Sequence, residues 1–306
     1  MTGIHFIDAI LSILLAVCGL FTGFIDGGTP EATGNFELQA EQKLLLFDAM
    51  YSGQGITTDG KNFYTSGSMT AVDMAGLAKW DAEFNRLVTN DDAIPGKYRE
   101  MGNNHIGGIS YYNGLIYASC EKTGKGHTQF VMTYDAKSLK FKDAFEVPSE
   151  YLPEGIPWLA VDGDNEFIYT SHFGKEVETE NRLGPVERIC AFKLEPSEDA
   201  DGNKKLVFDH YIELEYPIIR IQGGEYIDGV IYLSIDNADS NDDDVLAVDV
   251  KTGKIEVIST RSLPAMAGNE AEGLTVVKNK DGSLTFNILD YDKTVATYVR
   301  TYKYTK

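Results

Sequence analysis

The sequence contains few cysteines and few basic residues. Its 306 residues include three cysteines, too few for a disulfide framework, and Cys120 and Cys190 lie in strand-like segments where a small buried thiol is the default. Lys and Arg number 27 against 47 Asp and Glu, which gives a formal net charge of −20. Because a phosphate backbone is bound by clustered Lys and Arg, this composition argues against nucleic acid, and equally against anionic membrane surfaces, as partners.

Several motifs of well-known enzyme classes are also missing. The chain has no G-x-S-x-G elbow, no Walker loop, no H-E-x-x-H and no dinucleotide fingerprint, so no nucleotide cofactor motif is present. After residue 35 no stretch shows a long helical period, which disfavours α/β folds. The excess of carboxylates fits a solvated acidic surface, divalent cations or a cationic ligand.

The N-terminus has no positive charge before its apolar run. Ala9 to Ile25 are 17 residues without a charge, and the first basic residue of the chain is Lys43. We expect a signal peptide or membrane anchor over residues 1–26 and a linker over 27–35, followed by a domain over 36–306. The protein would then be exported (extracellular, periplasmic or anchored at the cell surface) and would touch a membrane only through this segment. "LLAVCG" is similar to a lipoprotein box with Cys18 as the lipidated residue; the alternative is a buried helix of the fold.

A short phrase that ends in Tyr-x-Ser recurs along the rest of the chain. Its aromatic position is aligned at intervals of about 50 to 60 residues, at Tyr64, Tyr117, Tyr169, Tyr232 and, in a degenerate copy, Phe286. Each copy follows a short apolar strand and a turn with Asp-Gly, Asn-Gly or Asp-Gly-Asp, which favours a tight hairpin. The longest interval contains the polar insertion "EPSEDADGNKK" at 195–205.

This repeat pattern predicts an all-β fold, a β-propeller of five four-stranded blades. The fifth unit ends at Lys306 after its third strand. We expect "EQKLLLFDA" at 41–49 to supply the missing outer strand, which would join the two ends of the domain and remove an open edge. The alternative is an open or six-bladed arrangement.

The residues that follow the repeated phrase differ between units, and they are the candidate site. In a propeller blade the start of the first strand and the end of the second meet at one rim of the central channel. Two residues past the Ser, the aligned positions are Ser68, Glu121, Phe173, Asp236 and Asp290. Just before the first strand they include Gln54, Gln222 and Glu272, with His105, Trp158, His172, Arg220 and Glu270 close by.

Oxygen atoms that converge from several units are typical ligands of Ca²⁺, and histidines among them would permit Zn²⁺ or Mn²⁺. The metal candidates are Glu121, Asp236, Glu270, Glu272 and Asp290. Glu121 or Glu272 could act as general base, with His105 as an alternative. Gln54, Trp158, His172, Gln222 and Arg220 are the candidates for contact with another ligand. The alternative is a polar rim whose carboxylates are only solvated.

At "NNHIGGISYYNGLIYASCE", "WLAVDGDNEFIYTSHF", "IQGGEYIDGVIYLSID" and "NEAEGLTV" the chain resembles exported bacterial β-propeller proteins of unassigned function. It is distantly similar to the lactonase and gluconolactonase propellers, and this resemblance implies a divalent metal in the central channel. In its expected number of blades, five, the chain resembles the calcium-activated nucleotidases. Two functions follow: a binding or scaffold protein whose rim recognises a small molecule, glycan or protein, or a metal-dependent hydrolase of a lactone, ester or phosphoester.

Overall fold

The structure is a computed structural model that describes residues 32–45, 49–69, 73–237, 242–262, 269–292 and 296–306. Its contacts divide the chain into Met1–Glu31 and Ala32–Lys306. The expected signal or anchor over 1–26, the lipidation candidate Cys18 and most of the linker lie outside the described residues. Within the described ranges, no helix is both long enough and apolar enough to cross a membrane.

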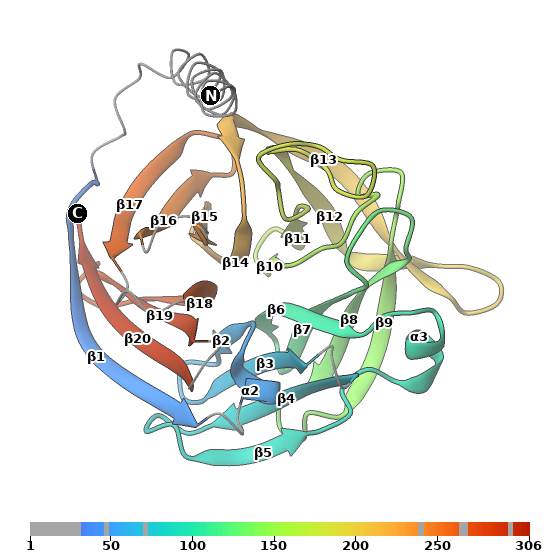
Figure 1. Ribbon diagram of the computed structural model, residues 1–306, viewed down its shortest axis with the longest axis horizontal. Helices are drawn as coiled ribbons and strands as arrows, with labels where there is room; N and C mark the ends of the chain where they lie inside the picture. Colours follow the sequence, from blue (N-terminus) through green and yellow to red (C-terminus); the bar gives the residue numbers. More distant parts are fainter. Residues whose placement is uncertain (1–31, 46–48, 70–72, 238–241, 263–268, 293–295) are drawn as a thin grey trace, which may run out of the picture. The chain divides into compact units, whose positions relative to one another are not determined.

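The domain is all-β, and its strands form antiparallel meanders (Figure 1). One sheet consists of β2 (Ile56–Thr58), β3 (Phe63–Met69), β4 (Met74–Trp80) and β5 (Arg86–Asn90). Another consists of β14 (Ile221–Ile227), β15 (Val230–Ile235), β16 (Asp242–Asp249) and β17 (Ile255–Ser262). The helices of the described residues are short, α2 (Ala49–Ser52) and α3 (Gly96–Glu100).

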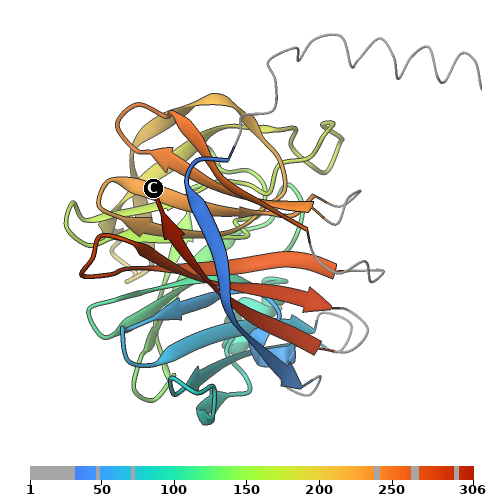
Figure 2. The ribbon, with the colours of Figure 1, turned by 90° about the vertical axis from the view of Figure 1, so that its left-hand side faces the viewer.

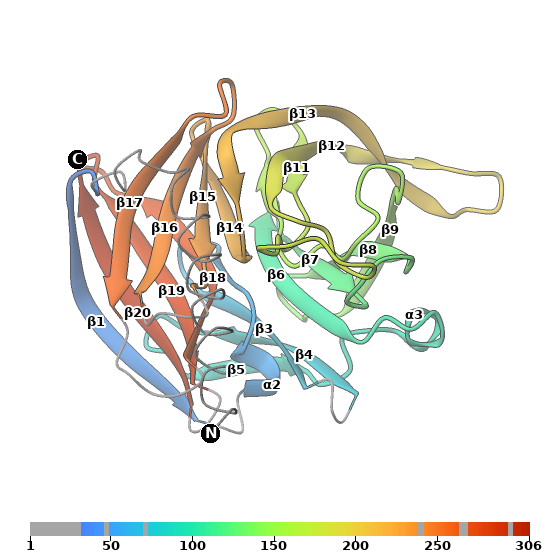
Figure 3. The same ribbon diagram turned by 45° about the horizontal axis from the view of Figure 1, so that its top comes forward.

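An eight-stranded sheet contains two further meanders. The first is β6 (His105–Tyr112), β7 (Leu115–Glu121), β8 (Gln129–Asp135) and β9 (Phe141–Val147). The second is β10 (Ala160–Asp162), β11 (Phe167–Thr170), β12 (Val186–Glu198) and β13 (Lys204–Ile218). They join through a short parallel pairing of Lys204 and Lys205 with Phe145 and Glu146. The polar insertion at 195–205 therefore forms the tip of a long hairpin, which extends away from the other strands in Figure 3.

The last sheet joins the two ends of the domain, as the sequence predicted. It has the order β1 (Asn35–Leu45), β20 (Ala296–Thr305), β19 (Leu284–Asp292) and β18 (Asn269–Lys278). Figure 2 shows β1 beside β20, and the antiparallel register runs from Asn35 opposite Thr305 to Leu45 opposite Ala296. The strand does not cover the whole of 41–49, because α2 begins at Ala49.

The first strands of the five meanders, β2, β6, β10, β14 and β18, lie nearest the common centre of the sheets in Figure 1. Their backbones approach closely, and glycine is required for this. A Cβ added at Gly223 would lie 2.6 Å from the Cα of Gly273, and one at Gly107 would clash with the carbonyl of Pro157. The serines of the repeated phrase hold these strands together: Ser66 Oγ accepts the N–H of Gly55 at 2.9 Å and donates to the carbonyl of Gly107 in the next meander at 2.6 Å.

The aromatic residues of the phrase lie in the second strand of each meander. Their side chains are only 0% to 9% exposed, at Tyr64, Tyr117, Tyr169, Tyr232 and Phe286. They are buried because each sheet is covered on both faces by its neighbours, so apolar side chains of adjacent sheets fill the space between them. The recurring aromatic is thus a core residue, and the rim beyond it can vary.

Candidate functional site: the charged rim

The predicted site residues lie where the second strands end and the first strands begin, a region that we call the rim. Glu121 ends β7 and lies opposite His105, the first residue of β6. Asp236 follows β15, and Asp290 and Glu272 lie in β19 and β18. All four residues are buried: Glu121 is 5% exposed, Asp236 1%, Glu272 2% and Asp290 2%. The rim carboxylates are therefore buried groups that need partners within the protein.

Arginines neutralise two of these carboxylates. The carboxylate of Asp290 accepts two hydrogen bonds from Arg261, each 3.0 Å long, and one from Arg300 at 2.6 Å. Asp236 forms an ion pair with Arg220, whose Nε also donates to the backbone carbonyl of Asp236 at 2.7 Å. At these two positions, guanidinium groups therefore compensate the repulsion between neighbouring carboxylates.

Glu121 and His105 form the least satisfied pair of the rim. Oε1 of Glu121 lies 3.5 Å from Nδ1 of His105, too far for a good hydrogen bond. Oε2 of Glu121 and Nδ1 of His105 are both buried, and neither has a hydrogen-bond partner among the described residues. The carboxylate lies against Gly155, where a Cβ would overlap Oε2. A buried polar atom without a partner is costly, so this pair can accept a donor group of a ligand or a cation.

The remaining candidates are distributed differently from what the sequence predicted. Gln54 contacts Glu272, with Nε2 3.3 Å from Oε1. Trp158 is fully buried and donates to Ser171 Oγ at 2.9 Å, so its indole belongs to the core and is not available to a ligand. Gln222 is half-buried at an irregularity of β14, and Glu270 is half-buried in β18, opposite Tyr291.

His172 is held by the loop that follows β11. Its Nε2 lies 3.0 Å from the carbonyl oxygen of Gly184. Burial lowers the pKa of His172 below its ordinary value of 6.5, although the bond to Gly184 and the nearby Glu154 oppose this. The imidazole is therefore neutral at pH 7, and its Nε2–H is used within the loop.

Sequence reasoning missed several charged groups of the rim. Glu154 is 2% exposed and accepts the N–H of Leu183 at 2.6 Å, and its Oε1 lies 2.6 Å from Nε of Arg182. Asp243 is 3% exposed; burial raises its pKa to about 7, with Asp236 and Asp290 acting in the same direction and Arg261 opposing. Neither residue occupies an aligned position of the repeats, so only three-dimensional proximity could reveal them.

In the part of the chain that the structure describes, no three His, Cys, Asp or Glu side chains are grouped so that they could hold a metal ion. Four of the metal candidates have separate neighbours instead. Asp236 and Asp290 are paired with arginines, Glu272 contacts Gln54, and Glu121 lies near His105. A divalent metal at this rim stays a prediction.

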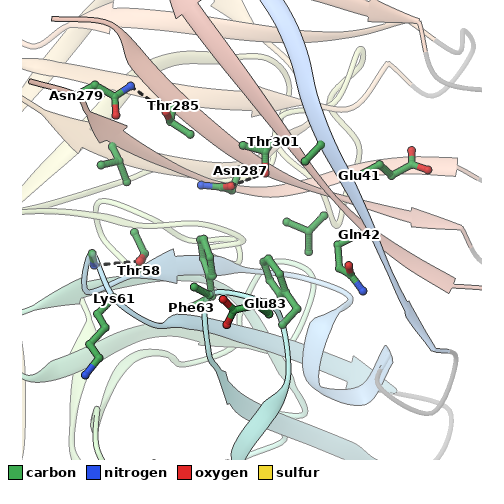
Figure 4. Close-up of a pocket in the computed structure, with 16 residues that line it drawn as sticks. Glu41, Gln42, Thr58, Lys61, Phe63, Glu83, Asn279, Thr285, Asn287 and Thr301 are labelled. Atoms are coloured by element: carbon green, nitrogen blue, oxygen red, sulfur yellow. Dashed lines mark hydrogen bonds between the residues drawn. The ribbon is translucent and has the colours of Figure 1, made fainter. Parts of the chain in front are cut away.

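Grooves also lie between neighbouring sheets, away from the rim. The groove in Figure 4 has a volume of about 460 Å³ and includes the stacked rings of Phe63 and Phe84, 4.6 Å apart, and the amides of Asn279 and Asn287. Grooves of about 440 and 530 Å³ occur between other pairs of sheets. Because they recur where sheets pack side by side, they reflect the architecture and do not single out a site.

Comparisons with known proteins bear on the fold. No protein-family model and no curated protein matches the chain. Among solved structures it is similar to the RS223 β-xylosidase, with a TM-score of 0.52 and 12% identity over 86% of this chain and 94% of that one. It is also similar to a GH43_1 enzyme from Xanthomonas citri (TM-score 0.49, 11% identity, 88% and 90% covered) and to the tail fibre of Staphylococcus aureus phage P68 (TM-score 0.49, 12% identity, 90% and 54% covered).

The likeness to the β-xylosidase, at 12% identity, shows the fold alone. It supports a β-propeller-like scaffold for this chain. The similarity to lactonase propellers and the export of the protein stay predictions.

Proposed function

We propose that this chain is an exported or membrane-anchored β-propeller of five blades, and that it is a binding or scaffold protein that recognises a small molecule, glycan or protein at its rim. The observation that carries the proposal is the pair of buried, unpartnered atoms at the rim, Oε2 of Glu121 and Nδ1 of His105. Since such atoms are normally satisfied, they favour a ligand that donates hydrogen bonds there. Five meanders, the last completed by β1, support the blade count.

The proposal can be tested by a glycan and small-molecule screen with the full chain. The Glu121→Gln variant keeps the size of the side chain but converts one carboxylate oxygen into a donor, so a ligand that donates to Glu121 should bind about tenfold more weakly. Glu146→Gln, at a half-exposed carboxylate of β9, is the matched control and should bind normally. Ligands whose binding is the same in both variants and the wild type would argue against the rim.

The metal-dependent hydrolase remains the second candidate, because the same pair offers one nitrogen and one carboxylate ligand. Ca²⁺ usually takes six to eight oxygen ligands, and Asp236 and Asp290 already bind arginines. A metal bound to the folded state raises the melting temperature by mass action. The test measures the melting temperatures of the wild type and Glu121→Gln with and without Ca²⁺, Mn²⁺ or Zn²⁺. Hydrolysis assays on lactones, aryl esters and nucleotides follow. If none of the three ions changes the melting temperature of the wild type, this candidate is contradicted.

A further inference from the structure

Three cationic groups surround one aromatic ring of the rim. Phe173 occupies the position that Glu121, Asp236 and Asp290 occupy in other units. Nζ of Lys175 lies 4.7 Å from the centre of the Phe173 ring, and the guanidinium carbons of Arg220 and Arg182 lie 5.2 Å and 5.7 Å from it. Cations are attracted to aromatic rings at such distances, so Phe173 holds the three groups in one place. In a chain of net charge −20, this is a local concentration of positive charge.

The neighbouring carboxylates neutralise two of the three cations. Arg220 forms an ion pair with Asp236, and Arg182 forms one with Glu154. Lys175 has no carboxylate within ion-pair distance among the residues with described positions, although the exposed Glu176 and the buried Glu154 are close enough to favour its charge. Lys175 is therefore the cation of the cluster whose charge is not used in an ion pair within the described residues.

Several hydrogen-bond donor atoms of the cluster make no hydrogen bond to the described residues. Nη1 of Arg220, both Nη atoms of Arg182 and Nζ of Lys175 donate to no other residue in the described ranges. The Arg220 and Arg182 side chains are 12% and 23% exposed, and Lys175 is half-buried, so solvent reaches all three. The pKa of Lys175 is lowered by burial, and then by Arg220 and Arg182, as expected where the local potential is positive.

We propose that Lys175, Arg182 and Arg220 bind an oxyanion, a carboxylate or a sulfate ester, carried by the ligand of the rim; this inference rests on the proposed binding function. Guanidinium groups bind such oxygens with directed, charge-assisted hydrogen bonds, and an ammonium adds a point charge.

The cluster is connected to the Glu121 pair along the rim. Glu154, the partner of Arg182, is next in sequence to Gly155, against which the Glu121 carboxylate packs. A ligand that donates to Glu121 and carries an oxyanion would therefore meet both groups on the same side of the domain. The ligand class is then a polar molecule, such as an acidic saccharide, with donor groups and an oxyanion.

The test uses the full chain and three monosaccharide probes: glucuronate, glucose 6-sulfate and glucose. Ligand-observed NMR titration measures their affinities. We expect glucuronate and glucose 6-sulfate to bind about tenfold more tightly than glucose, and Lys175→Gln to remove most of that difference, since one charge-assisted bond is lost. Lys137→Gln, at an exposed lysine in the turn after β8, makes the same charge change elsewhere and should bind as the wild type does. Affinity for the anions should also fall as salt rises.

Several outcomes would overturn the inference. Equal affinity for glucose and glucuronate, no detectable binding of either anion, or an unchanged affinity of the anions in Lys175→Gln each contradict it. Arg220 and Arg182 are not used as test positions, because their loss would leave a buried carboxylate unpaired and could unfold the rim. If glucuronate and glucose 6-sulfate bind, weaken in Glu121→Gln and are unaffected in Lys175→Gln, the rim function stands and the anion site fails.

Discussion

At the scale of single residues, buried carboxyl groups are stabilised in two ways. The carboxylate of Asp290 is paired with Arg261 and Arg300. Glu225, in the innermost strand β14, has hydroxyl groups as its side-chain partners: Thr275 Oγ1 lies 2.9 Å and Thr57 Oγ1 3.5 Å from its Oε2. Hydroxyls compensate less of the desolvation of a charge than guanidinium groups do, so burial raises the pKa of Glu225.

We expect Glu225 to make the protein less stable as pH rises. Burial raises its pKa from 4.5 to about 7, although hydrogen bonds from Thr275, the Tyr226 backbone and Thr57 oppose this. The folded state therefore binds a proton that the unfolded state has lost, and about 3 kcal/mol of the free energy of unfolding is lost as pH rises from about 4.5 to 7. Urea unfolding at pH 5 and pH 8 measures this loss, which Glu225→Gln should reduce by about that amount. Since Asp243 shifts in the same direction, some loss should remain, and an identical pH dependence in both proteins would refute the assignment.

At the scale of elements, β1 completes the last sheet through both backbone pairing and aromatic packing. The ring of Phe36 stacks on Tyr302 with 4.6 Å between centres and meets the edge of Phe286 at 5.3 Å. An outer strand without such an anchor would leave β20 as an open edge. The closure of the domain thus depends on a few side chains near its N-terminus.

We expect Phe36→Ala to lower the free energy of unfolding by about 2 kcal/mol, because the half-buried ring loses its aromatic contacts. Leu38→Ala in the same strand is the control: Leu38 is 54% exposed, so the change should stay within about 0.5 kcal/mol. Urea unfolding of both variants measures the difference. If both changes have the same small effect, β1 does not close the last sheet in solution.

At the scale of the whole molecule, the structure places the beginning and the end of the domain side by side. The N–H of Thr33 donates to the carbonyl of Val257 at 3.0 Å, and its hydroxyl lies 3.2 Å from that of Tyr304. Gly34 approaches the backbone of Thr305 so closely that a Cβ would lie 2.5 Å from its carbonyl oxygen. The contacts of the domain therefore begin slightly before residue 36, inside the range expected to be linker.

We expect a chain of residues 32–306 to fold by itself, with the circular dichroism spectrum and melting temperature of the full chain. A chain of residues 46–306, which lacks β1, should lose several kcal/mol of stability or aggregate, because a whole strand of burial and pairing is removed. Circular dichroism and size-exclusion chromatography of the two truncated proteins provide the measurement. Aggregation of 32–306 in a buffer where the full chain is soluble would contradict the proposed boundary.

The sequence by itself determined the strands, the repeated phrase and the partner of the N-terminal strand. These features depend on local properties: apolar alternation, turn residues between strands, and a last unit that ends one strand early. The repeats also predicted that Glu121 and His105 lie near one rim, and the structure places them opposite each other in β7 and β6.

Only the tertiary structure decided which charged groups meet. Arg261 and Arg300 reach Asp290, and Arg182 reaches Glu154, from segments that carry no signal in the repeat. It also decided that Trp158 is a core residue, because its burial depends on the neighbouring strand with Gly224. Ion pairs and burial arise between side chains that are distant in sequence, and their energies depend on desolvation by the whole fold, which a local pattern does not encode.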